Sequence, residues 1–180
     1  MELSGFELKR IDADYDIKPF RCSDDDLTDF FMNDAKPSIR SLLTVTYVIE
    51  KGNQTVAFFS LLNDKITAEE VKSKRYFNKV FKLQLPESKG FHSYPAVKIA
   101  RLGVGKDFTG QGWGTEILNY IKQTFIKNNR TGCRYITVDA YNKPDTLKFY
   151  EKNKFVYLEE HPDKVKESTK LMYFNLTTLT

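Results

Sequence analysis

The stretch VKIARLGVGKDFTGQGWGT, residues 97–115, decides the fold of this chain. Its first half is apolar and predicts a buried strand over 97–104, which a short polar turn follows. A helix is then predicted to begin among alternating glycines, Gly110, Gly112 and Gly114. Alternate glycines at the start of a helix leave backbone N–H groups uncovered, and the helix dipole directs its positive end at a ligand. The stretch therefore predicts a seat for a phosphate or pyrophosphate.

The composition is that of a globular protein. Of the 180 residues, 41% are hydrophobic and 14% aromatic, which predicts one domain over 1–180 with a sizeable core. No apolar run approaches membrane-spanning length and the first residues lack a signal peptide's apolar core, so we expect a cytoplasmic protein without a membrane partner. The two cysteines lack CxxC spacing and there are only two histidines, so we expect free thiols and neither a metal site nor a Ser-His-Asp triad.

The formal net charge of +4 is concentrated in one segment, residues 65–89. Seven basic and three acidic residues lie there, and the difference of four equals the whole surplus. The simpler interpretation is a solvated helical face. The alternative is a surface for a phosphate-rich partner such as RNA.

The remaining segments alternate between strand and helix patterns. Strands are predicted over 6–11, 43–50, 54–62, 134–140, 155–158 and 171–176, and helices over 24–35, 68–82 and 145–152, with a loop over 86–94. The helix that the glycine loop opens has Ile117, Leu118, Ile121 and Phe125 on one face, and Gly132 ends this unit. Ser23, followed by three aspartates, is predicted to cap the first helix, which should end before Pro37. The order of these elements predicts a mixed α/β sheet.

Two common phosphate-binding motifs do not fit the glycine loop. A P-loop needs Lys and Ser or Thr after its last glycine, whereas Thr115 and Glu116 follow Gly114 here. A dinucleotide fingerprint places its first glycine in the tight turn at the end of the strand. Here the glycines come six residues after the predicted end of the strand, and Thr115 takes the place of the third glycine.

The loop and a second block resemble the GNAT N-acetyltransferases. The loop, Thr109-Gly110-Gln111-Gly112-Trp113-Gly114, is similar to their pattern Arg/Gln-x-x-Gly-x-Gly/Ala. The second block, FYEKNKF at 149–155, is similar to the family's FYEKxGF. Thr109 stands where the family has Arg or Gln, and Lys154 stands where it has Gly. The interval from Asn142 to Tyr150 is one residue longer than expected.

This resemblance implies a single domain with a central mixed, mostly antiparallel sheet of six to seven strands flanked by helices. It implies acetyl-CoA as cosubstrate, with no metal. Tyr150 should act as general acid toward the CoA thiolate, since a phenol keeps its proton at neutral pH. The residues that it implies for cofactor binding are Leu102, Gly103, Val104, Thr109, Gly110, Gln111, Gly112, Trp113, Gly114, Thr115 and Asn142.

For several of these side chains a purely structural role is also open. Tyr150 can pack on the sheet with its hydroxyl in water, and Trp113 fits packing better than ligand contact. Asp139, at a strand end, is either a structural hydrogen-bond acceptor or a helper in the reaction. Cys133 fits a small buried apolar residue better than a nucleophile.

The acceptor amine is less defined by the sequence. The strand 97–102 has no carboxylate to serve as general base, so an amine of low pKa, such as the α-amino group of an aminoacyl ester, suits it. The layout is also similar to the toxin branch of the GNAT family, which implies aminoacyl-tRNA as acceptor and a small ribbon-helix-helix antitoxin as partner, and leaves room for a homodimer. The alternatives are a small-molecule or protein amine acetyltransferase and a CoA-binding module without turnover.

Overall fold

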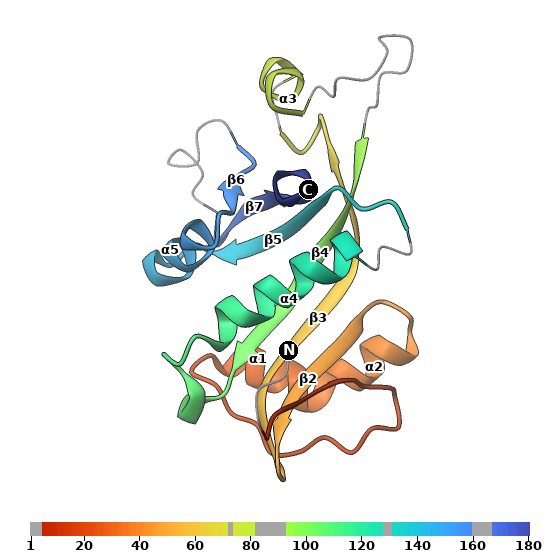
Figure 1. Ribbon diagram of the computed structural model, residues 1–180, viewed down its shortest axis with the longest axis vertical. Coiled ribbons are helices and arrows are strands. Elements are labelled where there is room, and N and C mark those ends of the chain that lie inside the picture. Colours follow the sequence, from red (N-terminus) through yellow and green to blue (C-terminus); the bar gives the residue numbers. More distant parts are fainter. Residues whose placement is uncertain (1–4, 72–73, 82–92, 128–130, 160–166) are drawn as a thin grey trace. The chain divides into compact units, whose positions relative to one another are not determined.

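The computed structural model describes residues 5–71, 74–81, 93–127, 131–159 and 167–180 (Figure 1). Its strands form a seven-stranded sheet in the order β1-β2-β3-β4-β5-β7-β6. The pairs β1/β2, β2/β3, β5/β7 and β6/β7 are antiparallel. The prediction of a mixed α/β fold around a mostly antiparallel sheet of six to seven strands is therefore confirmed.

The elements follow the predicted order along the chain. The strands are β1 (Glu7–Arg10), β2 (Val45–Lys51), β3 (Gln54–Thr67), β4 (Ser93–Val104), β5 (Tyr135–Tyr141), β6 (Val156–Tyr157) and β7 (Thr169–Asn175). The α-helices are α1 (Asp25–Asp29), α2 (Ala35–Arg40), α3 (Lys74–Phe81), α4 (Trp113–Lys127) and α5 (Pro144–Lys152). A π-helical turn, Phe30–Asp34, joins α1 to α2, and 3-10 turns occupy Lys106–Phe108 and Leu176–Leu179. None of the helices in the described ranges is long and apolar enough to cross a membrane.

The chain forms two compact units, each made of two segments. Unit 1 comprises Met1–Leu62 and Ile99–Thr124, and unit 2 comprises Asn63–Lys98 and Phe125–Thr180. Each unit has a hydrophobic core of its own. The extent of a single domain, 1–180, stays a prediction.

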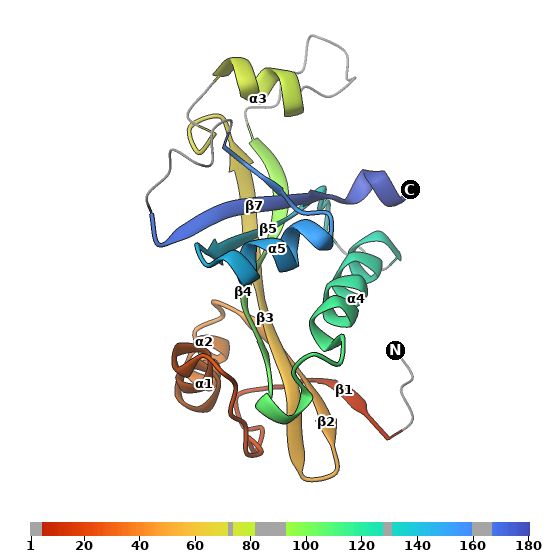
Figure 2. The same cartoon turned by 90° about the vertical axis from the view of Figure 1, so that its left-hand side faces the viewer.

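Unit 1 packs different helices on the two faces of its strands (Figure 2). Phe58 of β3 faces α1 and α2, and its ring stacks on Phe31 with centroids 4.5 Å apart. Phe59, the next residue of β3, points to the other face, and its ring centroid lies 6.1 Å from that of Tyr120 on α4. Because successive side chains of a strand alternate between faces, these two phenylalanines fix both helical layers.

The first helical segment is longer than predicted and has a different cap. Asp24, rather than Ser23, is the N-cap, and its side chain accepts hydrogen bonds from the N–H groups of Asp26 and Leu27. Pro37 lies in the first turn of α2 and does not end the helix, contrary to the sequence prediction. A proline is tolerated there because the N–H groups of a first turn have no intrahelical acceptor.

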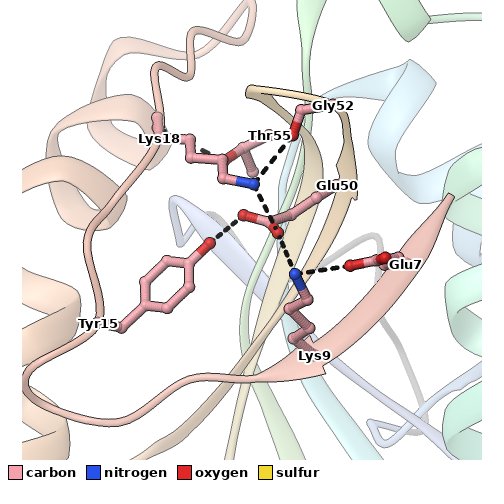
Figure 3. Close-up of polar contacts among 7 residues, drawn as sticks. All are labelled: Glu7, Lys9, Tyr15, Lys18, Glu50, Gly52 and Thr55. Carbon is pink, nitrogen blue, oxygen red and sulfur yellow. Dashed lines mark hydrogen bonds and ion pairs between the residues drawn. The ribbon is translucent and has the colours of Figure 1, made fainter.

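A buried carboxylate fixes the segment that leads to α1 (Figure 3). Glu50 of β2 is 2% exposed and accepts hydrogen bonds from Tyr15 and, at 2.9 Å each, from Lys9 and Lys18. Lys18 also donates to the carbonyl of Gly52 at 2.9 Å. The network ties β1 and the segment around Lys18 to the turn between β2 and β3.

Unit 2 has an aromatic core rich in tyrosine. Tyr135 of β5 lies 5.7 Å from Tyr173 of β7 and 5.4 Å from Phe81 of α3, measured between ring centroids. Ile66, Val71, Phe77, Tyr94, Ala96 and Leu158 complete the cluster. Ala68–Val71 forms turns where a helix was predicted, and Ser93 and Tyr94 belong to β4 where a loop was predicted. Residues 86–92 of that predicted loop lie outside the described residues.

Candidate active site

The glycine loop of unit 1 has the backbone that its sequence predicts. Gly110 and Gly112 have φ values of +79° and +87°, which side chains other than glycine rarely adopt. A Cβ at either position would have no heavy atom within 4 Å. The loop therefore presents bare backbone beside open space, as close approach of a phosphate requires.

Helix α4 begins directly after this loop, at Trp113. The backbone N–H of Glu116 donates to the carbonyl of Gly112 at 3.1 Å, which closes the first helical turn. The N–H groups of Trp113 and Gly114 precede that bond and have no acceptor within the helix. Together with the positive end of the helix dipole, they fit the pyrophosphate of a CoA molecule.

Two side chains of the loop hydrogen-bond to the preceding turn. The hydroxyl of Thr109 donates to the carbonyl of Gly105 at 3.2 Å, and the amide of Gln111 donates to the carbonyl of Asp107 at 2.9 Å. The Thr109 side chain thus stabilises the approach to the loop. The backbone of Thr109 and Gln111 lies next to the glycines in the chain, and a role of these two residues in cofactor binding stays a prediction.

Trp113 is 6% exposed, and its ring centroid lies 4.6 Å from that of Phe6. The side chain therefore packs inside unit 1, as the structural interpretation predicted. A role for the backbone N–H of Trp113 in ligand binding stays a prediction.

The end of β4 provides the residues predicted along the pantetheine arm. Leu102 and Val104 are half-buried, and Gly103 is buried. A Cβ on Gly103 would lie 2.6 Å from Cε1 of Phe58, so only glycine fits between this strand and the aromatic core. Their contacts with a ligand stay a prediction.

Tyr150 lies on α5 in unit 2 and is 6% exposed. Its ring lies between Phe149 and Phe155, with centroid distances of 5.0 and 5.3 Å. Burial raises the pKa of Tyr150, because the phenolate would lose its hydration. The hydroxyl thus stays protonated at neutral pH, which is the state that a general acid needs.

The block that contains Tyr150 includes one residue in the left-handed region, shortly after the end of α5. Lys154, where the family has glycine, has a φ of +68°. The N–H of Phe155 donates to the carbonyl of Tyr150 at 3.0 Å and ends α5. Asn142 donates its side-chain amide to the carbonyl of Glu167 at 3.0 Å. A role for Asn142 in cofactor binding stays a prediction.

Sequence reasoning missed a charge cluster on three strands of unit 2. Lys98 of β4 lies 3.0 Å from a carboxylate oxygen of Asp139 on β5 and 3.8 Å from one of Asp64 on β3. Thr137 of β5 donates its hydroxyl to the same Asp64. Asp139 is therefore at least a structural partner of Lys98. Only the pairing of the strands brings together residues that lie so far apart in the sequence.

A small pocket of unit 1 lies where the chain leaves β4. It has a volume of about 320 Å³ and is lined in part by Arg21, Thr55, Gly105 and Lys106. Of the seven basic residues of the segment 65–89, only Lys65 and Arg75 have side chains that the structure describes. In the described part of the chain, no group of three or more His, Cys, Asp or Glu side chains is placed to hold a metal ion.

The comparisons agree with this geometry. A family model described as an acetyltransferase (GNAT) domain matches residues 43–157, which contain both the glycine loop and Tyr150. No curated protein matches the chain significantly.

Solved structures share the fold at low sequence identity. A tyrosine-to-phenylalanine mutant of KacT superposes with a TM-score of 0.76 at 19% identity, covering 98% of each chain. AtaTR bound with acetyl-CoA gives 0.71 at 18% identity, covering 98% of this chain and 97% of that one. AtaT complexed with acetyl-methionyl-tRNAfMet gives 0.70 at 17% identity, covering 97% and 96%.

Proposed function

The chain belongs to the GNAT acetyltransferase family, and from that premise we propose that it transfers the acetyl group of acetyl-CoA to the α-amino group of an aminoacyl-tRNA. The observation that carries the acetyl-CoA part is the glycine loop. Gly110 and Gly112 leave open space at the start of α4, where backbone N–H groups without an acceptor in the helix can bind an anion. We propose that Gly110 to Thr115 bind the pyrophosphate there.

The proposed chemistry is direct transfer in a ternary complex. The amine attacks the thioester carbonyl, so a C–N bond forms while the C–S bond breaks. The backbone at Leu102, Gly103 and Val104 orients the pantetheine arm, and the N–H near Val104 stabilises the developing oxyanion. Tyr150 donates its proton to the departing thiolate. The amine loses one proton to water, and water returns a proton to Tyr150.

Two features support aminoacyl-tRNA as the acceptor. The strand segment 97–102 contains no carboxylate, so an acceptor amine of lower pKa, which loses its proton more readily without a general base, suits it better than an alkyl amine. An α-amino group has a pKa near 8, whereas a lysine-type amine has a pKa of about 10.4. Among the structures of the same fold, AtaT has been captured with an acetylated aminoacyl-tRNA.

We further propose that a small antitoxin holds the enzyme inactive. AtaT has been solved bound to the C-terminus of the antitoxin AtaR, and the KacTA assembly has been solved with DNA. A small neighbouring reading frame with a ribbon-helix-helix pattern, if found, would support this proposal. Co-purification of its product with this chain tests it directly.

The decisive experiment is incubation of the purified protein with charged tRNA and radiolabelled acetyl-CoA. We expect label in the aminoacyl-tRNA, released by mild base as N-acetyl-amino acid. Label only in polyamines or added protein contradicts the tRNA proposal and supports the small-molecule or protein alternative. Thermal stabilisation by acetyl-CoA without transfer to any amine supports the binding module.

A further inference from the structure

Arg101 of β4 holds its guanidinium against an aromatic ring of unit 1. Its guanidinium lies over the ring of Phe30, with Cζ 5.0 Å from the ring centroid, and Nη1 donates to the carbonyl of Ala100 at 2.8 Å. Its Nε is buried and has no hydrogen-bond partner. Among the residues that the structure describes, no carboxylate lies within ion-pair distance of Arg101.

An arrangement of this kind is costly unless a ligand completes it. Arginine has five N–H donors and keeps its charge at any physiological pH. Buried donors in native proteins nearly always have an acceptor, and an exception calls for an explanation such as a missing ligand. The half-buried side chain of Arg101 still has an exposed part from which a ligand can approach.

The aromatic side of the contact is built to be rigid. Phe30 begins the π-helical turn Phe30–Asp34, and such turns occur frequently at functional sites. Its ring is stacked with that of Phe58, with 6.2 Å between centroids. A planar guanidinium held between this ring and its own strand keeps its remaining N–H groups in a fixed direction.

Arg101 also precedes Gly103 by two residues, so the two lie on the same face of β4. Gly103 faces Phe58 and Phe20, and the resemblance to the family implies that it borders the pantetheine arm. The guanidinium thus belongs to the strand segment that is expected to line the reaction centre.

We propose that Arg101 binds a phosphate of the acceptor, namely the phosphodiester beside the terminal adenosine of an aminoacyl-tRNA; this inference rests on the proposed function. An unneutralised guanidinium with free donors is matched best by an oxyanion that takes two N–H groups at once. That phosphodiester is the anionic group nearest the reacting amine at the end of a tRNA. A polyamine acceptor would instead bring positive charge toward Arg101.

The test uses two acceptors that differ by one phosphodiester. Puromycin carries a free α-amine on an aminoacyl nucleoside without phosphate, and cytidylyl-puromycin adds the phosphodiester. Release of CoA thiol gives kcat/KM for each. We expect the unaltered protein to prefer cytidylyl-puromycin about ten- to a hundred-fold, the range for a charge-assisted hydrogen bond.

Substitutions at Arg101 should remove that preference and little else. In Arg101→Gln the ratio of the two kcat/KM values should fall to about one, while the KM for acetyl-CoA stays unchanged. Arg101→Lys should keep part of the preference, because lysine keeps the positive charge but lacks the planar pair of N–H donors that arginine presents to an oxyanion. Phe30→Leu should also weaken it by loosening the guanidinium. Arg40→Gln, which alters an exposed arginine of the same unit, should leave the ratio unchanged.

A binding measurement separates this inference from the proposed function. Fluorescence anisotropy with labelled cytidylyl-adenosine needs neither an amine nor acetyl transfer. Weaker binding to Arg101→Gln, with normal binding to Arg40→Gln, supports the inference even if no tRNA is acetylated. Equal binding to Arg101→Gln and the unaltered protein overturns it. If Lys106→Gln weakens binding of cytidylyl-adenosine and Arg101→Gln does not, the inference is also overturned, because the phosphate then binds at the pocket beside Gly105. An equal loss of activity with both puromycins in Arg101→Gln shows a structural role instead.

Discussion

The ammonium of Lys98 lies between two carboxylates, 3.0 Å from Asp139 and 3.8 Å from Asp64. The three residues come from β4, β5 and β3, so the ion cluster joins three strands of unit 2. Burial lowers the pKa of Lys98, but the hydrogen bond to Asp139 and the charges of Asp139, Asp64 and Glu70 outweigh it, so the pKa is raised above 10.5.

Replacing Lys98 by Met should destabilise the protein by about 1–2 kcal/mol at pH 8, between the values for exposed and buried ion pairs. A raised folded-state pKa means that this stabilisation is complete below pH 10.5 and is lost as the pH rises through that pKa. Urea unfolding at pH 8 and pH 11 should therefore show the difference shrinking at the higher pH. Lys148→Met, at an exposed site of the same unit, is the control. If the difference in unfolding free energy between the unaltered protein and Lys98→Met is as large at pH 11 as at pH 8, the effect comes from packing and not from the ion pairs.

Glu50→Gln should cost about 2–4 kcal/mol, because it removes the negative charge and one of the two acceptor oxygens that Lys9, Lys18 and Tyr15 share. Burial raises the pKa of Glu50, but its hydrogen bonds to Tyr15, Lys18 and Lys9 lower it more, so the net pKa lies below 4.5. Because the folded-state pKa is lowered, the ionised Glu50 stabilises the folded protein fully above pH 4.5. This stabilisation is lost as the pH falls through the folded-state pKa. Urea unfolding at pH 7 and pH 3 should show that the difference in unfolding free energy between the unaltered protein and Glu50→Gln is smaller at pH 3. Glu7→Gln, at an exposed partner of Lys9, should change stability by no more than about 0.5 kcal/mol.

Gly112→Ala should raise the KM for acetyl-CoA about ten-fold or more, because a methyl group would occupy the open space in which the pyrophosphate is proposed to lie. It should also cost about 1 kcal/mol of stability from its φ of +87°. Gly5→Ala is matched, because Gly5 has a φ of +84° and no atom within 4 Å. Steady-state kinetics should show a normal KM in that control. An equal rise in both variants would trace the effect to backbone strain.

Tyr150→Phe should lower turnover about 10²- to 10⁴-fold, the usual contribution of a general acid. Because the ring keeps its packing against Phe149 and Phe155, thermal stabilisation by acetyl-CoA should be retained. Since burial raises the pKa of Tyr150, the pH profile of kcat in the unaltered enzyme should show no loss from phenol ionisation up to pH 10. Tyr157→Phe is the matched control in unit 2. Full turnover in Tyr150→Phe would remove it from the mechanism.

Lys154→Gly should stabilise the protein by about 1 kcal/mol, because a φ of +68° is unfavourable for lysine and easy for glycine. For a chain of this size, that corresponds to a rise in Tm of about 2–4 °C. Lys148→Gly, in the middle of α5, should have the opposite sign, since glycine weakens a helix interior by about 0.5–1 kcal/mol. Calorimetry of the two variants compares them directly. A lower Tm for Lys154→Gly would show that the lysine side chain makes up for the strain.

The sequence by itself determined the order of the elements and the form of the glycine loop. Strand and helix periodicity are local properties, and glycine at 110 and 112 permits the positive φ that the loop adopts. The motif around Tyr150 could be recognised for the same reason. Local signals also misled at the first helix, where the π-helical turn and the position of Pro37 within α2 carry the helix beyond its predicted end.

Only the tertiary structure decided which side chains meet across strands. The Lys98 cluster depends on the pairing of β3, β4 and β5, and the Glu50 network depends on where the segment around Lys18 returns to β2. The buried Nε of Arg101 exists only because the fold brings Phe30 over the guanidinium, and among the described residues it has no hydrogen-bond partner there. Such contacts join residues far apart in the chain, and their energies come from burial and geometry, which no local pattern of residues encodes.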